Sequence, residues 1–125
     1  MALFEQAQRK RAKARVALCG PSGSGKTHSA LLIAAGLGKK IAVVDTENGS
    51  AELEAGKPGI PAFDVAKMNP PFDPTKYIKA MQEAEAAGYD VIVLDSISHA
   101  WAGTGGLLEK KDALSAASKG DSWGA

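Results

Sequence analysis

The residues with the clearest chemical purpose lie between Gly20 and Thr27 and read Gly-Pro-Ser-Gly-Ser-Gly-Lys-Thr. Glycines lack a β-carbon, so a loop rich in them can adopt positive φ and approach a ligand closely. Backbone N–H groups turned inward then form an anion-binding nest, and a helix that begins near Gly25 adds its free N–H groups. The pattern G-x-x-x-x-G-K-T is that of a phosphate-binding loop. The predicted binding residues are Gly20, Pro21, Ser22, Gly23, Ser24, Gly25, Lys26, Thr27 and His28.

Three side chains are suited to charge and metal chemistry at this loop. Lys26 can reach the β- and γ-phosphates of a bound nucleotide, and the Thr27 hydroxyl can ligate Mg²⁺. Asp95 follows the apolar run Val91-Ile-Val-Leu94, about 70 residues after the loop. An apolar strand that ends in Asp at this separation is the Walker B pattern, whose carboxylate holds Mg²⁺. We therefore predict Thr27 and Asp95 as the metal-binding residues.

A second pair of carboxylates follows another apolar run, Ile41-Ala-Val-Val44. In open α/β sheets, ligands bind beyond the carboxyl ends of the strands. Glu47 is therefore a candidate to polarise an attacking water. Asp45 is a candidate to support Glu47 without contacting the ligand itself. The alternative is that both residues serve only the loop and its caps.

The surrounding pattern predicts the elements that position these residues. Short apolar runs predict buried strands over 15–19, 41–44 and 91–94, and a short edge strand over 62–66. We expect a helix over 28–37, with one apolar face made of Ala30, Ile33, Ala34 and Leu37. A second helix is expected over 74–87, capped by Asp73, with an inward face made of Tyr77, Ile78, Met81 and Ala84. A helical turn at 51–55 and a helix over 107–118 complete the predicted α/β order.

Composition sets limits on the class of protein. The chain has 125 residues, 45% of them hydrophobic, and a net charge of +1, which is ordinary for a globular domain with no general attraction to nucleic acid or membrane. Cys19 is the only cysteine, so an internal disulfide is excluded, and we expect a buried, reduced thiol in a cytoplasmic protein. No apolar run is long enough to span a membrane.

The N-terminal segment is basic. We expect residues 1–14 to form a polar helix, 15–118 to form the nucleotide-binding core, and 119–125 to be a flexible end. The basic cluster near the start of the chain either contacts a nucleic-acid backbone or is a solvated helix face. It consists of Arg9, Lys10, Arg11, Lys13 and Arg15.

Together, Gly20–Thr27, Val43-Val-Asp-Thr-Glu47 and Val91-Ile-Val-Leu-Asp95-Ser96 resemble the RecA-like branch of the P-loop NTPases. The segments Lys67-Met-Asn-Pro-Pro-Phe-Asp and Asp95-Ser-Ile-Ser-His-Ala-Trp101 are similar to the bacteriophage-type AAA/RecA-like ATPases, which include single-strand-annealing recombination ATPases. The resemblance implies a parallel sheet with helices on both faces and hydrolysis of ATP with Mg²⁺. It also implies catalytic roles for Glu47 and Lys26, single-stranded DNA as a partner, homo-oligomers of the full-length protein, and the cytoplasm of a bacterial host.

The sequence departs from this family after Trp101, where no apolar run supplies the further strand that such folds place between the phosphate-loop strand and the Walker B strand. We therefore expect a sheet that is incomplete toward the C-terminus, as in an N-terminal fragment or a divergent minimal form. Two other functions stay open: a non-catalytic, nucleotide-dependent binding module or switch, and a small-molecule kinase. His99 and Trp101 either sense the γ-phosphate or a partner, or simply pack the loop.

Overall fold

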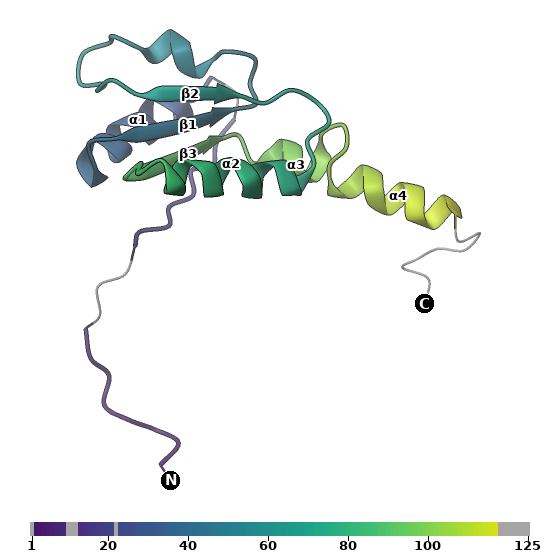
Figure 1. Ribbon diagram of the computed structural model, residues 1–125, viewed down its shortest axis with the longest axis horizontal. Coiled ribbons are helices and arrows are strands. Elements are labelled where there is room, and N and C mark those ends of the chain that lie inside the picture. The colour runs from purple at the N-terminus through teal and green to yellow at the C-terminus, as the bar shows by residue number, and fades with distance from the viewer. Residues whose placement is uncertain (1, 10–12, 22, 118–125) are drawn as a thin grey trace.

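The computed structural model describes residues 2–9, 13–21 and 23–117, and its centre is a parallel sheet of three strands. The strands are β1 (Ile41–Asp45), β2 (Asp64–Lys67) and β3 (Val91–Asp95), in the order β2-β1-β3 (Figure 1). Asp45 is in register with Lys67 on one side and with Asp95 on the other. The residues that follow β1 and β3 therefore lie side by side at the carboxyl end of the sheet.

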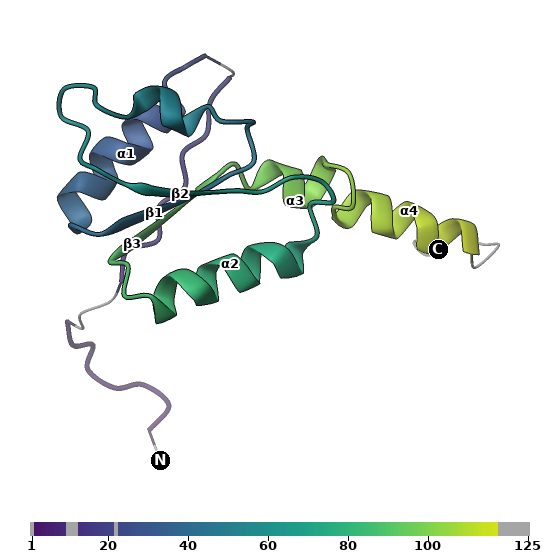
Figure 2. The same ribbon diagram turned by 45° about the horizontal axis from the view of Figure 1, so that its top comes forward.

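Helices cover the sheet on both faces, as Figure 2 shows. Helix α1 (Lys26–Leu37) and the 3-10 helix η1 (Ala51–Glu54) lie on one face, and α2 (Pro74–Ala86) lies on the other. The short helix α3 (Ser98–Ala102) follows β3, and α4 (Leu107–Ala117) extends away from the sheet (Figure 1). The predicted α/β class with a parallel sheet is confirmed, and these features fit a P-loop-like fold.

The hydrophobic core lies between β1 and the α1 face. Its fully buried members are Leu31, Ala34, Ile41, Val43 and Ala51. Strand β1 contributes most because it is central and has neighbours on both sides, whereas the side chains of β3 are only half-buried. The prediction that the strand over 91–94 is buried was therefore wrong, because its side chains are only partly buried.

The strand predicted over 15–19 is absent. These residues have no regular structure, Val16 and Leu18 are 61% and 40% exposed, and Cys19 is exposed rather than buried. A strand exists only where a neighbour takes its backbone hydrogen bonds. In the part of the chain that the structure describes, no strand pairs with this segment, and its apolar side chains remain largely exposed.

The helix predicted over 1–14 is also absent from residues 2–9, 13 and 14, which are all exposed. Leu3 and Phe4 are 88% and 85% exposed, so a helix here would bury no apolar face. Isolated short helices are marginal in water, and tertiary packing usually stabilises them. Residues 10–12 and the predicted flexible end at 119–125 lie outside the described residues.

The bounds of α1 and α2 agree with the prediction, but their buried faces are narrower. Tyr77 and Ala84 are buried as expected, whereas Ile33, Leu37, Ile78 and Met81 are 38–54% exposed. On α1, Leu31 and Ala34 face the core. A sheet of three strands covers only one stripe of each helix, so flanking apolar residues remain in solvent. Within the described ranges, no helix has the length and apolar character needed to cross a membrane.

Candidate functional site

The phosphate-loop segment forms a tight turn before α1. Gly23 and Gly25 have φ of 78° and 87°, in the left-handed region that glycine tolerates best. A β-carbon on Gly20 would lie 2.7 Å from Ser24 Oγ, so this position is also tight. The Ser24 N–H donates to Pro21 O at 3.2 Å, which closes the turn. The predicted Ser22 lies outside the described residues.

Helix α1 begins directly at Lys26. The first bond of its ladder runs from the Ser29 N–H to Gly25 O at 2.9 Å, and among the described residues no side chain caps this end. The N–H groups of the first turn are therefore available to an anion, and the helix dipole favours negative charge there. The Lys26 ammonium donates to Gly20 O, which ties the two ends of the loop together.

Thr27 and Asp95 are in direct contact. The Thr27 hydroxyl donates to Asp95 Oδ2 at 2.9 Å, across the gap between the start of α1 and the end of β3. Burial raises the pKa of Asp95, and the carboxylates of Asp45 and Glu47 raise it further, while the Thr27 bond and the Lys26 charge act in the opposite direction. A cation placed here would offset this accumulation of negative charge.

The donor set at this contact fits Mg²⁺. A hydroxyl and a carboxylate are hard oxygen donors, and Mg²⁺ is commonly held by one or two protein oxygens together with substrate phosphates and water. The described residues contain no cluster of three or more His, Cys, Asp or Glu suited to an all-protein metal site. The pair Thr27 and Asp95 therefore matches a metal brought in with a phosphate ligand.

Asp45 organises the loop that carries Glu47. Its side chain is 1% exposed, and its two carboxylate oxygens accept from the Glu47 N–H at 2.7 Å and the Ala51 N–H at 3.3 Å. These contacts agree with the alternative given in the sequence analysis, in which Asp45 serves the loop. Glu47 itself is on the surface, with its side chain 41% exposed. Its Oε1 accepts from Ser96 Oγ at 2.9 Å.

Sequence reasoning missed the polar network around Ser96. The buried Thr46 hydroxyl lies 2.9 Å from the Ser96 N–H, 3.1 Å from Ser96 O and 2.8 Å from His99 Nδ1. The Tyr77 hydroxyl also donates to Ser96 O, at 2.9 Å. The signal that could have found this network is the polar residue directly after each of the two strands.

His99 packs the loop in this structure. Its ring stacks on Phe72 with centroids 4.6 Å apart, and its Nδ1 lies 3.7 Å from Glu47 Oε1. Trp101 is 56% exposed on α3. His28 makes a different contact, because its Nδ1 lies 2.8 Å from Glu54 Oε2 and so links α1 to η1.

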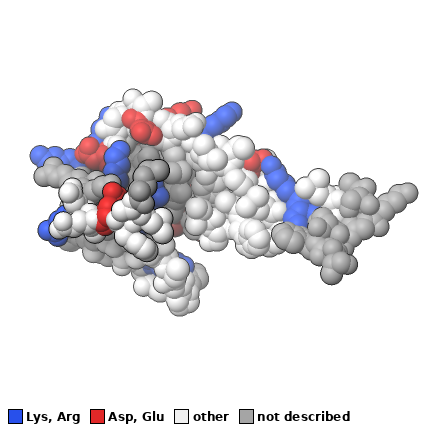
Figure 3. Space-filling model, turned by 90° about the horizontal axis from the view of Figure 1, so that it is seen from below, with Lys and Arg blue, Asp and Glu red and all other residues white. Residues whose placement is uncertain are grey.

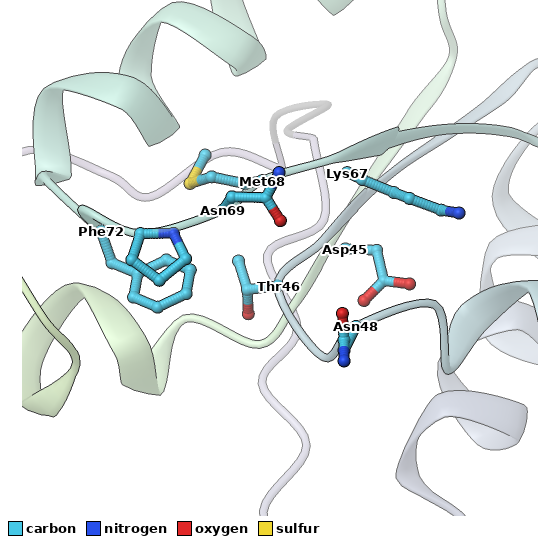
Figure 4. A pocket seen from close by; sticks show the side chains of 8 residues that line it. Asp45, Thr46, Asn48, Lys67, Met68, Asn69 and Phe72 are labelled. Carbon is cyan, nitrogen blue, oxygen red and sulfur yellow. The ribbon is translucent and has the colours of Figure 1, made fainter.

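A separate pocket of about 300 Å³ opens between the loops after β1 and β2 (Figure 4). Its lining comes from the end of β1 and the loop after it, and from the end of β2 and the loop after it: Asp45, Thr46, Asn48, Lys67, Met68, Asn69, Pro70 and Phe72. Among the described residues, none from the phosphate loop lines it. The face shown in Figure 3 carries basic and acidic side chains side by side rather than a patch of one sign.

A family model described as an AAA domain matches residues 12–125. The chain belongs to the AAA domain family. AAA domains are generally nucleotide-binding ATPases, which agrees with the α/β architecture of this AAA domain. No curated protein and no solved structure shows significant similarity to it.

Proposed function

We propose that this AAA domain binds Mg-ATP at the loop Gly20–Thr27 and hydrolyses it. The observation that carries the proposal is the 2.9 Å contact between Thr27 and Asp95. In P-loop NTPases the hydroxyl of the loop and the carboxylate of the Walker B strand hold the metal that neutralises the phosphates. These two side chains, far apart in the sequence, meet beside the uncapped start of α1.

Each residue has a distinct part in the proposed reaction. The N–H groups of the loop and of the first turn of α1 bind the phosphate oxygens, and Lys26 stabilises the negative charge that develops on them. Mg²⁺, when bound by Thr27 and Asp95, supplies further neutralisation of that charge. Glu47 orients the attacking water, and Asp45 holds the backbone of Glu47 in place. Phosphoryl transfer of this kind depends mostly on positioning and charge.

The test of ATP hydrolysis is phosphate release by the purified chain with and without Mg²⁺. Lys26→Ala should lower kcat/KM by about 100-fold or more, since it removes a charge directed at the transferred group. Lys79→Ala, on the exposed surface of α2, is the matched control and should act like the parent. Equal hydrolysis by Lys26→Ala and the parent would contradict the proposal.

We further propose that the ATPase serves DNA recombination or single-strand annealing in a phage-infected bacterial cell, and that it acts as a homo-oligomer. This step rests on the resemblance of the motifs and on the basic N-terminal segment, in which Arg9, Lys13 and Arg15 are exposed. Affinity for single-stranded DNA should then fall steeply with salt. Replacing Lys13 and Arg15 by Gln should weaken DNA binding, and unchanged affinity would argue against this role.

A non-catalytic, nucleotide-dependent switch is the second candidate. Two observations favour it: the exposed segment 13–19 that precedes the phosphate loop, and the half-buried β3. A phosphate loop between such exposed elements has few packed neighbours that could fix the catalytic groups in the geometry of the transition state. Tight ATP binding without phosphate release, even in the presence of single-stranded DNA, would support the switch over the ATPase.

A further inference from the structure

We propose that Ser96 is a positioning residue for Glu47, and that its hydroxyl fixes one carboxylate oxygen so that the other faces the attacking water. The inference rests on the proposed ATP hydrolysis, and it names a residue outside the phosphate loop and the two strand-end carboxylates. The observation behind it is the bond of 2.9 Å from Ser96 Oγ to Glu47 Oε1.

The two oxygens of Glu47 have different surroundings. Oε1 accepts from Ser96 and lies 3.7 Å from His99 Nδ1, whereas no described residue donates a hydrogen bond to Oε2. The side chain is 41% exposed, so solvent reaches it. A carboxylate held through one oxygen has a defined direction, and its second oxygen remains free to accept from a water.

The Ser96 backbone is held from three directions. Its N–H donates to Thr46 Oγ1, and its carbonyl accepts from the Tyr77 hydroxyl and from the Thr46 hydroxyl. Thr46 and Tyr77 are 6% and 4% exposed, so these anchors are buried. A side chain on a backbone fixed in this way has few alternative positions. Ser96 can therefore act as a firm reference point for the exposed Glu47.

Strand register brings the two residues together. Asp45 pairs with Asp95, and the ladder continues for one more bond, from the Thr46 N–H to Asp95 O at 2.8 Å. Glu47 is anchored separately by its own N–H, which donates to Asp45 Oδ1. Both ends of the Ser96–Glu47 contact are thus attached to strand ends rather than to loose loop.

The direction of the hydrogen bonds follows from the number of protons. The Ser96 hydroxyl has one hydrogen, and when Glu47 accepts it, the neighbouring Ser98 Oγ at 2.9 Å donates to Ser96 Oγ. Ser98 stabilises the contact only indirectly, through Ser96. Its removal should therefore lower kcat less than removal of Ser96 does. This order of effects separates a hydrogen-bonded chain from general loss of packing.

The experiment measures ATP hydrolysis and Mg-ATP affinity for the full chain, Ser96→Ala, Ser98→Ala and Ser96→Thr. Ser96→Ala should lower kcat by about ten-fold, as expected for loss of one hydrogen bond to a charged group. KM and affinity should stay at the parent values, because Ser96 does not contact the nucleotide in this proposal. Ser98→Ala should have a smaller effect, and Ser96→Thr, which keeps the hydroxyl, should recover part of the activity.

A double-mutant cycle with Glu47→Gln tests whether Ser96 acts through Glu47. In the Glu47→Gln background, Ser96→Ala should cause no further fall in kcat. The same ten-fold fall in both backgrounds would overturn the inference, because Ser96 would then act by another route. If Ser96→Ala does not fold, Ser96→Cys takes its place, because cysteine has nearly the same volume as serine but a weaker hydrogen-bond donor. Ser96→Cys should also lower kcat.

The outcomes separate this inference from the proposed function. If the parent hydrolyses ATP and a folded Ser96→Ala or Ser96→Cys variant is equally active, only the inference about Ser96 is overturned. A parent that binds ATP and releases no phosphate overturns the proposed hydrolysis and the inference with it.

Discussion

The Thr27 hydroxyl donates a hydrogen bond of 2.9 Å to Asp95 Oδ2 across a sequence separation of 68 positions. The contact joins the first turn of α1 to the carboxyl end of β3. It forms because α1 packs against β3 and begins immediately after the loop, so that Thr27 is carried to the strand end.

Glu47→Gln should spare nucleotide binding and suppress hydrolysis. The amide keeps the size of the side chain but cannot accept from water as a carboxylate does, so kcat should fall by about 100-fold. The measurement is phosphate release at saturating Mg-ATP, with affinity measured in parallel. Glu83→Gln, at an exposed position of α2, is the control and should match the parent. Parent-like turnover by Glu47→Gln would remove Glu47 from this role.

Asp95→Asn should stabilise the nucleotide-free protein while it abolishes stabilisation by Mg-ATP. The pKa of Asp95 is raised by burial and by nearby carboxylates, so the ionised side chain is less favourable in the folded state than in the unfolded state. This cost begins as the pH rises above 3.8 and is complete above the folded-state pKa, so it is present at neutral pH.

Asn removes that charge and can still accept from Thr27, so the Tm without ligand should be equal to that of the parent or higher. Thermal unfolding at pH 7, with and without Mg-ATP, measures both effects. A lower Tm of the ligand-free variant would contradict the electrostatic account. An unchanged rise in Tm on addition of Mg-ATP would contradict the metal-binding role of Asp95.

Two glycines near the end of α1 should respond in opposite directions to substitution by alanine. A β-carbon on Gly38 would lie 2.5 Å from Asp90 Cβ, so Gly38→Ala forces a clash and should lower the Tm. A β-carbon on Gly36, inside the helix, meets nothing within 4 Å, so Gly36→Ala should add about 0.5–1 kcal/mol of stability. Equal effects of the two substitutions would show that the approach of Gly38 to Asp90 is not tight in solution.

The cap of α2 should fail in acid. Asp73 caps the helix by accepting from the Thr75 N–H at 2.9 Å. The Lys110 ammonium beside it and this cap bond lower the pKa of Asp73 from 3.8 to about 2. A depressed pKa means that the contribution to stability is complete above pH 3.8 and is lost as the pH falls toward 2.

Asp73→Ala should therefore lower the Tm at pH 7, and the difference from the parent should shrink between pH 4 and pH 2. Asp112→Ala, which removes an exposed side chain of α4, should change the Tm little at either pH. A difference that stays constant down to pH 2 would contradict the assigned protonation of Asp73.

The sequence predicted best those features that are encoded locally. The glycines of the phosphate loop, the Asp73-Pro74 start of α2 and the branched run before Asp95 each specify a backbone shape through neighbouring residues, and the structure has these shapes. The strand predicted over 15–19 depended on a partner elsewhere in the chain. Its composition is that of a strand, but composition cannot supply the neighbour that a strand needs.

Contacts between elements were the second feature that the sequence did not predict. Nothing local in the sequence indicates that Ser96 meets Glu47, because that contact depends on the register of β1 against β3. The same reasoning applies to Ile33 and Met81, which carry the period of a helix face but lie beyond the reach of a narrow sheet. The candidate site could therefore be predicted as a set of residues, but not as a network of contacts.

The central claim is that the loop from Gly20 to Thr27 binds the phosphates of ATP together with Mg²⁺. The most direct test is a titration of the folded chain with fluorescent ATP, with and without Mg²⁺, beside Lys26→Ala. The account predicts saturable binding that Mg²⁺ strengthens and that Lys26→Ala weakens by about 100-fold or more. No saturable binding by the folded parent, or equal binding by Lys26→Ala, would contradict it.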